Sequence, residues 1–118
     1  MAADDYCYLT TTGRRSGQPH RIEIWYAVED QTLYLLAGGG RSSDWVRNLE
    51  VDPAVTLEIG ADELATRARV VDDGDEAELA RTLLFEKYQP RSGSDLSDWR
   101  QRALPVALDL PDRPSTTP

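Results

Sequence analysis

The chain has 118 residues, of which 40% are hydrophobic and 29% charged, a balance typical of a folded domain rather than of a disordered chain. Its formal net charge of −8 argues against a general nucleic-acid binder, because affinity for a phosphate backbone comes from clustered Lys and Arg. No apolar run approaches the roughly 18 residues that a membrane span needs, and the first residues are acidic where a secretory signal would be basic. We therefore expect a cytoplasmic protein with one domain over residues 1–110 and a flexible tail over 111–118.

Six stretches are rich in aromatic and β-branched residues or alternate apolar with polar ones, and each predicts a strand. These strands cover residues 6–12, 20–28, 32–37, 54–59, 63–71 and 104–110. Helices are predicted over 44–50 and 73–88, and residues 89–97 are expected to form a loop. Because helices do not separate most successive strands, the order β-β-β-α-β-β-α-β favours antiparallel pairing and a small barrel over a doubly wound α/β fold.

The turn between the first two strands carries a cationic cluster. The segment 10–21 contains three arginines and the only histidine, His20, and no acidic residue. The turn itself consists of Gly13, Arg14, Arg15, Ser16 and Gly17. Its glycines allow backbone N–H groups to converge into an anion-binding nest, and guanidinium groups suit phosphate or carboxylate. The alternative is a solvated hairpin turn with two exposed arginines, which is the more frequent case for such spacing.

A second glycine-rich segment follows the third predicted strand. Gly38, Gly39, Gly40 and Arg41 precede a predicted helix, and glycines there would let a flat ligand approach the backbone closely. The N-terminus of the helix would offer N–H groups to an anion, although the segment matches neither a Walker loop nor a dinucleotide-binding pattern. A flexible connector is the competing interpretation.

Three further residues near these segments are candidates for ligand binding. Trp25 and Trp45 could stack on a planar heterocycle, or pack in the core as most tryptophans do. Asn48, one helical turn after Trp45, could hold the glycine loop through backbone groups, or it could face solvent. The single cysteine, Cys7, offers no internal disulfide or metal cluster and lies within a predicted strand, so we interpret it as a small core residue.

Together, the segment 10–19 and the segment 45–49 followed by Pro53 resemble the flavin/deazaflavin oxidoreductase family, and more narrowly its deazaflavin-dependent nitroreductase branch. The resemblance covers about residues 8–110 and is weaker outside these two motifs, where it includes Tyr88 and Trp99. It implies a mainly β, split β-barrel fold of the FMN-binding or pyridoxamine-phosphate-oxidase-like type, with two or three short helices. It also implies binding of coenzyme F420, an 8-hydroxy-5-deazaflavin.

The resemblance further implies roles for individual residues. The arginine turn would meet the phosphate and glutamyl tail of the coenzyme, and the backbone of residues 38–40 would meet its tricyclic ring. Trp45 and Asn48 would shape the glycine loop, and Tyr88 would lie beside the substrate, where either it or solvent delivers a proton. The expected coenzyme-binding residues are Gly13, Arg14, Arg15, Ser16, Gly17, His20, Trp25, Gly38, Gly39, Gly40, Arg41, Trp45 and Asn48, with no metal ligands.

Departures from the pattern of the branch concern the substrate more than the coenzyme. His20 stands where the nitroreductase has an arginine, Glu23 replaces a proline, and Trp25 and Val46 each replace a tyrosine. The implied activity is hydride transfer from reduced F420 to a small electron-poor acceptor such as a quinone, an enone or a nitro compound. An FMN-dependent oxidoreductase on the same fold and a non-catalytic ligand-binding protein are the alternatives, and a homodimer is compatible with the fold.

Overall fold

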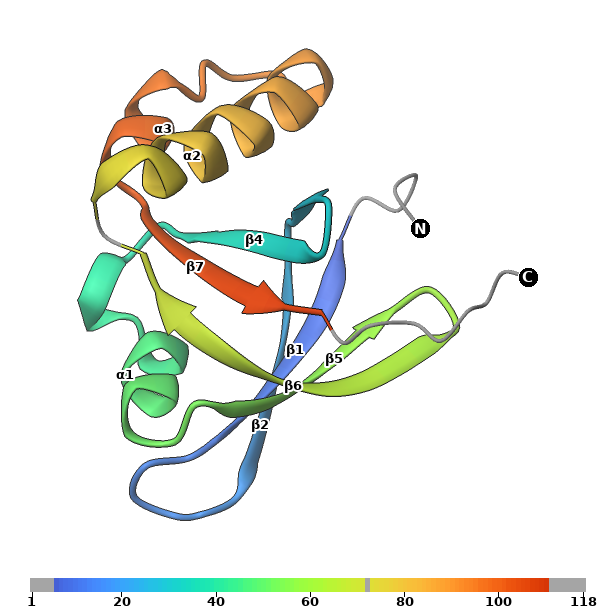
Figure 1. The fold of residues 1–118 in the computed structure, drawn as a ribbon. Helices are drawn as coiled ribbons and strands as arrows, with labels where there is room; N and C mark the ends of the chain where they lie inside the picture. Colours follow the sequence, from blue (N-terminus) through green and yellow to red (C-terminus); the bar gives the residue numbers. More distant parts are fainter. Residues whose placement is uncertain (1–5, 72, 111–118) are drawn as a thin grey trace.

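The computed structural model describes residues 6–71 and 73–110, in which seven strands form one antiparallel sheet (Figure 1). The strand order is β2-β1-β5-β6-β7-β4-β3. The strands are β1 (Cys7–Thr12), β2 (Pro19–Ile24), β3 (Ala27–Glu29), β4 (Thr32–Ala37), β5 (Ala54–Ile59), β6 (Asp62–Val70) and β7 (Leu104–Asp109). The sheet curls into an open half-barrel, which confirms the predicted antiparallel barrel. The tail predicted over 111–118 lies outside the described residues.

The main hydrophobic core fills the inside of this curl. Leu9, Leu33, Leu57 and Leu108 are fully buried there, each on a different strand. Helix α1 (Asp44–Val51) adds its own buried residues to the same cluster and so closes one end of the half-barrel. Cys7 is also fully buried, and burial raises the pKa of its thiol to about 12, as expected for a core residue rather than a nucleophile.

A second hydrophobic cluster lies between the sheet and two helices. Helix α2 (Gly74–Tyr88) packs Ala77, Ala80 and Leu84 against β4 and β7, and α3 (Ser97–Arg102) lies beside it at the top of Figure 1. The sequence interpretation gave α2 to within one residue. The loop predicted over 89–97 contains a 3-10 turn at Gln89–Arg91, and α3, which begins at the last residue of that loop, was not predicted. A six-residue helix has too few turns to show a helical period.

The predicted strand over 20–28 is wrong at one point, because the chain bends after Ile24. β2 pairs with β1, whereas β3 pairs with β4, so the chain crosses from one side of the half-barrel to the other between Ile24 and Ala27. At the bend, the backbone N–H of Tyr26 donates to the Tyr88 hydroxyl at 3.0 Å. Helix α2 thus supplies a hydrogen bond that a neighbouring strand would otherwise have supplied.

An ion-pair network fixes α2 to the sheet. Arg69 on β6 donates to Glu76 on α2 at 2.8 and 2.9 Å, and to Asp109 on β7 at 3.0 and 3.1 Å. The Tyr34 hydroxyl on β4 donates to Glu76 at 2.9 Å. The guanidinium of Arg69 lowers the pKa of both carboxyl groups, because its hydrogen bonds favour their charged forms.

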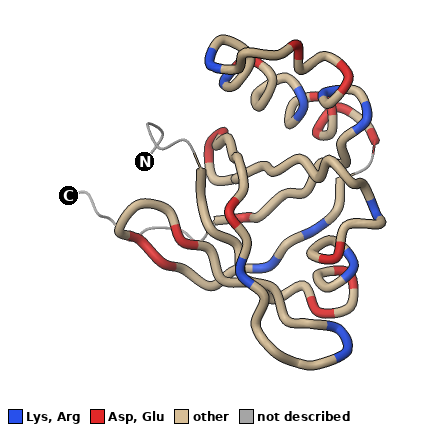
Figure 2. Tube along the Cα trace, turned by 180° about the vertical axis from the view of Figure 1, so that it is seen from behind, with Lys and Arg blue, Asp and Glu red and all other residues tan. Residues whose placement is uncertain are grey.

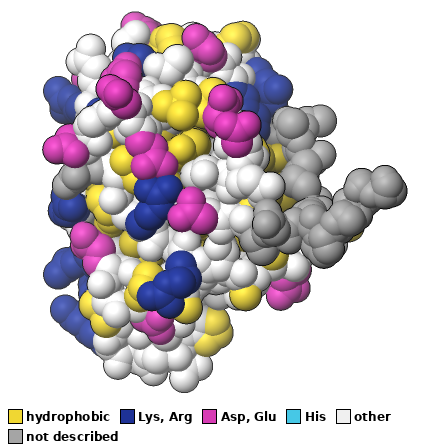
Figure 3. All heavy atoms as spheres, in the orientation of Figure 1, with side chains coloured by type: hydrophobic (Ala, Val, Ile, Leu, Met, Phe, Trp, Pro, Cys, Tyr) yellow, Lys and Arg dark blue, Asp and Glu magenta, His cyan; other side chains and the backbone are white. Residues whose placement is uncertain are grey.

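Charges on the surface are mixed in sign over the face drawn in Figure 3, where acidic and basic side chains lie next to one another. Within residues 6–71 and 73–110, no helix is long and apolar enough to cross a membrane.

The network makes stability depend on pH in a defined direction. Because the folded state lowers the pKa of Glu76 and Asp109, their contribution to the free energy of unfolding is present at neutral pH and is lost on acidification below their ordinary values of 4.5 and 3.8. We expect Arg69→Gln to flatten this loss in urea titrations at stepped pH. Arg47→Gln, which changes an exposed arginine on α1, is the matched control. An identical acid loss in the Arg69→Gln variant would contradict the assignment.

Candidate functional site

The β1–β2 turn and helix α1 enclose a basic pocket of about 240 Å³. Figure 2 shows the basic residues at the tip of this turn, beside α1. The pocket is lined by Gly13, Arg14, Arg15, Ser16, His20, Asp44 and Asn48. All but Asp44 were singled out from the sequence, and the fold brings the two separate segments 13–20 and 44–48 into one site.

Asn48 makes the connection between these two segments. Its side chain is only 3% exposed, and its Oδ1 accepts from the backbone N–H of Arg14 at 3.1 Å and from Arg14 Nη1 at 2.8 Å. Its Nδ2 donates to Thr11 Oγ1 at 3.3 Å. The resemblance implied that Asn48 shapes the glycine loop, and the structure instead shows it fixing the arginine turn.

The anion-binding nest that the glycines suggested is largely closed within the protein. The N–H of Gly13 donates to Gln18 O at 2.8 Å, and the N–H of Gly17 donates to Gly13 O at 2.9 Å. The N–H of Gln18 donates to Ser16 Oγ at 3.1 Å. Because these amides and that of Arg14 already have acceptors, any attraction for an anion would come mainly from the side chains of the turn.

Those side chains differ in how they are held. Arg14 is largely covered, with its guanidinium 3.3 Å from Asp44 Oδ1, whereas Arg15 is exposed at the tip of the turn. The imidazole of His20 lies over Gly13, where an added Cβ would come within 2.7 Å of Nε2. A side chain at position 13 would therefore displace the imidazole of His20, which forms a wall of the pocket.

The glycine-rich segment forms a tight connection between β4 and α1. A 3-10 turn spans Gly40–Ser42, and Gly40 has a φ of +61°, in the left-handed region that glycine adopts without strain. The Ser42 hydroxyl donates to Gly39 O at 2.7 Å, and Arg41 Nε lies 3.4 Å from Glu50 Oε2 on α1. Arg41 thus turns toward α1.

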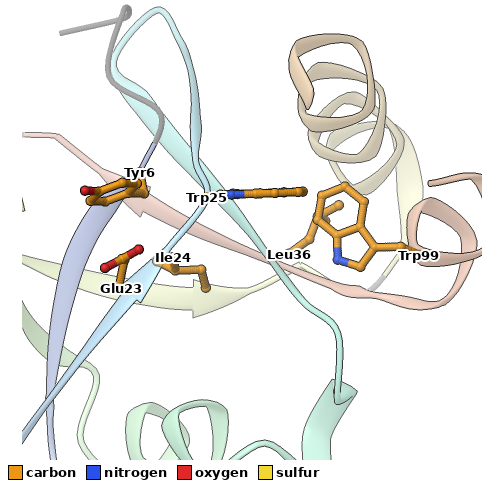
Figure 4. A pocket seen from close by; sticks show the side chains of 6 residues that line it. All are labelled: Tyr6, Glu23, Ile24, Trp25, Leu36 and Trp99. Atoms are coloured by element: carbon orange, nitrogen blue, oxygen red, sulfur yellow. The ribbon is translucent and has the colours of Figure 1, made fainter. Parts of the chain in front are cut away.

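An aromatic pocket of about 250 Å³ adjoins this segment (Figure 4). It is lined by Tyr6, Glu23, Ile24, Trp25, Leu36 and Trp99. A Cβ added at Gly38 would lie 3.8 Å from the indole of Trp99, so the glycine loop and this pocket share a wall. Of the lining residues, only Trp25 was predicted as a site residue. Tyr6 immediately precedes β1, and the other lining residues come from β2, β4 and α3.

Trp25 is held by two aromatic neighbours. Its ring stacks on Tyr88 with centroids 4.3 Å apart and planes 4° apart, and it meets Trp99 edge-on at 5.5 Å and 87°. Trp25 is 38% exposed, because it lies at the bend between β2 and β3, where no neighbouring strand among the described residues covers it. Trp45, the other predicted stacking residue, is partly buried and packs against the main core.

Tyr88 occupies a different position from the one expected of a proton donor. Tyr88 is 2% exposed. Its hydroxyl accepts a hydrogen bond from the N–H of Tyr26 and donates one to the carbonyl of Tyr26, each with a donor–acceptor distance of 3.0 Å. Lys87 Nζ donates to the same carbonyl at 2.8 Å. Through these contacts Tyr88 holds the backbone at the β2–β3 bend, while its ring stacks on Trp25.

The Asn48 contacts predict how much a substitution at this position destabilises the fold. We expect Asn48→Ala to lower the free energy of unfolding by about 2–3 kcal/mol, because it leaves the Arg14 amide and the Thr11 hydroxyl without a buried partner. Urea denaturation measures this. Asn48→Asp keeps an acceptor for Arg14 and should lose less. A loss under 0.5 kcal/mol in Asn48→Ala would show that the turn does not depend on this side chain.

The Tyr88 contacts generate a second prediction. Tyr88→Phe keeps the stacked ring but removes two hydrogen bonds at the bend, so it should cost about 2 kcal/mol of stability and alter turnover through Trp25. Urea denaturation and steady-state rates measure these two effects. Tyr34→Phe, which removes a hydroxyl at the ion-pair network, is the control. Near-complete loss of turnover with unchanged stability would instead support proton donation by Tyr88.

Comparisons with known proteins identify the family of this chain. The family model described as F420H(2)-dependent quinone reductase matches residues 1–111. An F420H(2)-dependent quinone reductase of Mycobacterium tuberculosis is 27% identical over 111 residues, which covers 85% of this chain and 69% of that protein.

Solved structures show the same fold. A structure of an F420-H2 dependent reductase superposes with a TM-score of 0.73 at 21% identity, covering 89% of this chain and 94% of that one. A candidate pyridoxamine 5′-phosphate oxidase from Listeria innocua gives a TM-score of 0.65 at 17% identity, covering 89% of this chain and 82% of that one. These likenesses confirm the split-barrel fold that the resemblance implied. With the family model matching nearly the whole chain, the protein belongs to the F420H(2)-dependent quinone reductase family and is an F420-dependent reductase.

Proposed function

We propose that this reductase uses F420H2 to reduce a quinone, and that the basic pocket holds the anionic tail of the coenzyme. The observation that supports the coenzyme site most directly is the pocket itself, in which Asn48 fixes the arginine turn against α1. The support for a quinone comes from the family, since the relative from M. tuberculosis is named as a quinone reductase.

The chemistry of the basic pocket fits a phosphate and glutamyl tail. Arg14, Arg15, His20 and the Ser16 hydroxyl supply donors and positive charge on an otherwise acidic protein. Gly13 lets the wall formed by His20 come close, so a side chain there would displace the imidazole. In this proposal Arg15 binds the tail directly, and Arg14 contributes charge from a fixed position beside Asp44.

The glycine loop and Trp25 would flank the ring system. The segment Gly38–Gly40 offers backbone with no side chains in the way, next to Trp99 and the aromatic pocket. Trp45 packs against the main core and would act on the loop only through that packing. Arg41, directed toward Glu50, would keep α1 in place beside the loop.

When bound, reduced F420 supplies a hydride to an electron-poor carbon or oxygen system, and the protein supplies orientation. No nucleophilic side chain is needed for this transfer, which agrees with the burial and raised thiol pKa of Cys7. Because the Tyr88 hydroxyl already donates to Tyr26 O, we propose that Tyr88 positions Trp25 and that solvent delivers the proton to the reduced acceptor.

The experiment that tests the coenzyme site is a titration of the protein with F420 and separately with FMN, followed by tryptophan fluorescence. We expect F420 to bind and Arg15→Ala to weaken it at least tenfold, because one charge-assisted hydrogen bond contributes about 1.5–3 kcal/mol. Arg102→Ala removes the same charge on α3, far from the β1–β2 turn in Figure 1, and should leave affinity unchanged. Preference for FMN, or binding of neither compound, would overturn the coenzyme assignment.

Turnover tests the acceptor. With F420H2 under anaerobic conditions, 1,4-naphthoquinone should be reduced faster than cyclohexenone or a nitroimidazole. Reduction of the enone or the nitro compound in preference to the quinone would contradict the proposed acceptor class while leaving the coenzyme assignment intact. Coenzyme binding without turnover of any acceptor would favour a non-catalytic binding protein.

The homodimer stays a prediction, for which sedimentation equilibrium is the direct measurement.

A further inference from the structure

The aromatic pocket contains one charged side chain among its lining residues, and that side chain is an acid. Glu23 lies on β2 at one end of the pocket, beside Tyr6, and Trp99 closes the other end (Figure 4). We propose that this pocket binds the ring of the acceptor, and that Glu23 makes it select neutral flat aromatic rings over anionic ones. This inference rests on the proposed function, which it deepens by naming the acceptor subsite and its charge preference.

The walls of the pocket suit a flat ring. Tyr88 and Trp99 hold the indole of Trp25 in a fixed orientation, yet the indole remains 38% exposed and lines the pocket. A rigid aromatic side chain offers a stacking surface at little cost in conformational entropy. Ile24 and Leu36 complete the apolar lining.

The size of the pocket limits what it can enclose. Its volume of about 250 Å³ is below the roughly 300 Å³ at which pockets for drug-sized ligands begin. A head of one or two fused rings is therefore the part of an acceptor that can lie inside, and any long substituent would extend into solvent. The pocket shares Trp99 with the glycine loop, so a ring bound here would be next to the proposed coenzyme site.

No cation on β2 neutralises the carboxylate of Glu23, because the arginine on that strand is paired with another acid. Arg21, two residues earlier on β2, is bound by Glu58 at 3.0 and 3.1 Å. The carboxylate of Glu23 accepts from the neutral hydroxyl of Tyr8 at 3.5 Å. Lys87 and Arg91 lie 5.0 and 6.0 Å from the centre of the Tyr88 ring, on which Trp25 stacks, and neither of them lines the pocket.

A carboxylate at the pocket repels an anionic ligand and has little effect on a neutral one. Glu23 is exposed, so the repulsion acts through solvent and weakens as salt increases. We expect a preference of roughly five- to tenfold for a neutral ring at low ionic strength. A substitution that removes the charge of Glu23 should also remove the preference for a neutral ring over an anionic one.

The test compares binding of 1,4-naphthoquinone and its 2-sulfonate by equilibrium dialysis, without coenzyme and at low salt. The variants are Glu23→Gln and, as a matched control, Glu29→Gln, which removes a carboxylate from β3 outside the pocket. Covalent addition to the only cysteine is not expected, because Cys7 is buried and the pKa of its thiol is raised.

Glu23→Gln should tighten the sulfonate five- to tenfold relative to the wild type and leave the neutral quinone within twofold. Glu29→Gln should behave as the wild type. Because each quinone is compared with itself across variants, differences in their size and reactivity cancel. An unchanged ratio in Glu23→Gln, or no binding of either quinone, would overturn the inference.

A turnover experiment with F420H2 separates this inference from the proposed function. Each quinone takes a hydride from the reduced coenzyme and a proton from solvent, giving the hydroquinone and oxidised coenzyme. Quinone turnover with a kcat/KM ratio unaltered by Glu23→Gln would refute the charge selection and leave the proposed function standing. Charge-selective binding without turnover would refute the proposed function and leave the pocket as a ring-binding site.

Discussion

The hydrogen bonds of Asn48 are the constraint on which the basic pocket depends. A buried amide on α1 accepts from both the backbone and the guanidinium of Arg14 and donates to Thr11 on β1. A flexible arginine turn would sample many positions, and ordering it on binding would cost conformational entropy. Because Asn48 fixes the turn before any ligand arrives, the cost is met during folding, and the positive side chains are already directed into one pocket.

The aromatic pocket depends in the same way on a contact between distant elements. Tyr88, at the end of α2, binds the backbone of Tyr26 at the bend and stacks on Trp25. The ion pairs of Arg69 with Glu76 and Asp109 attach the start of the same helix to β6 and β7. Helix α2 is thus fixed at both ends, and the position of Trp25 follows from that attachment.

The two pockets present opposite kinds of surface. One is polar and basic and is formed by the β1–β2 turn with α1; the other is apolar and aromatic and is formed at the β2–β3 bend with α3. The segment Gly38–Gly40 joins them, since it leads into α1 on one side and contacts Trp99 on the other. Small residues at this junction leave space for a ring system to reach the backbone.

The local pattern of the sequence determined most of the strands, the two longer helices and the position of the arginine turn, because alternation, turn residues and helical period act within a few residues. It could not determine the bend at Tyr26, since the side chains keep alternating there while the hydrogen bonds pass to Tyr88, 62 residues later. Nor could it show that Asn48 binds the arginine turn, or that Glu23 and Trp99 share a pocket with Trp25. These features depend on contacts between residues far apart in the chain, and only the tertiary packing of α1, α2 and α3 on the half-barrel decides them.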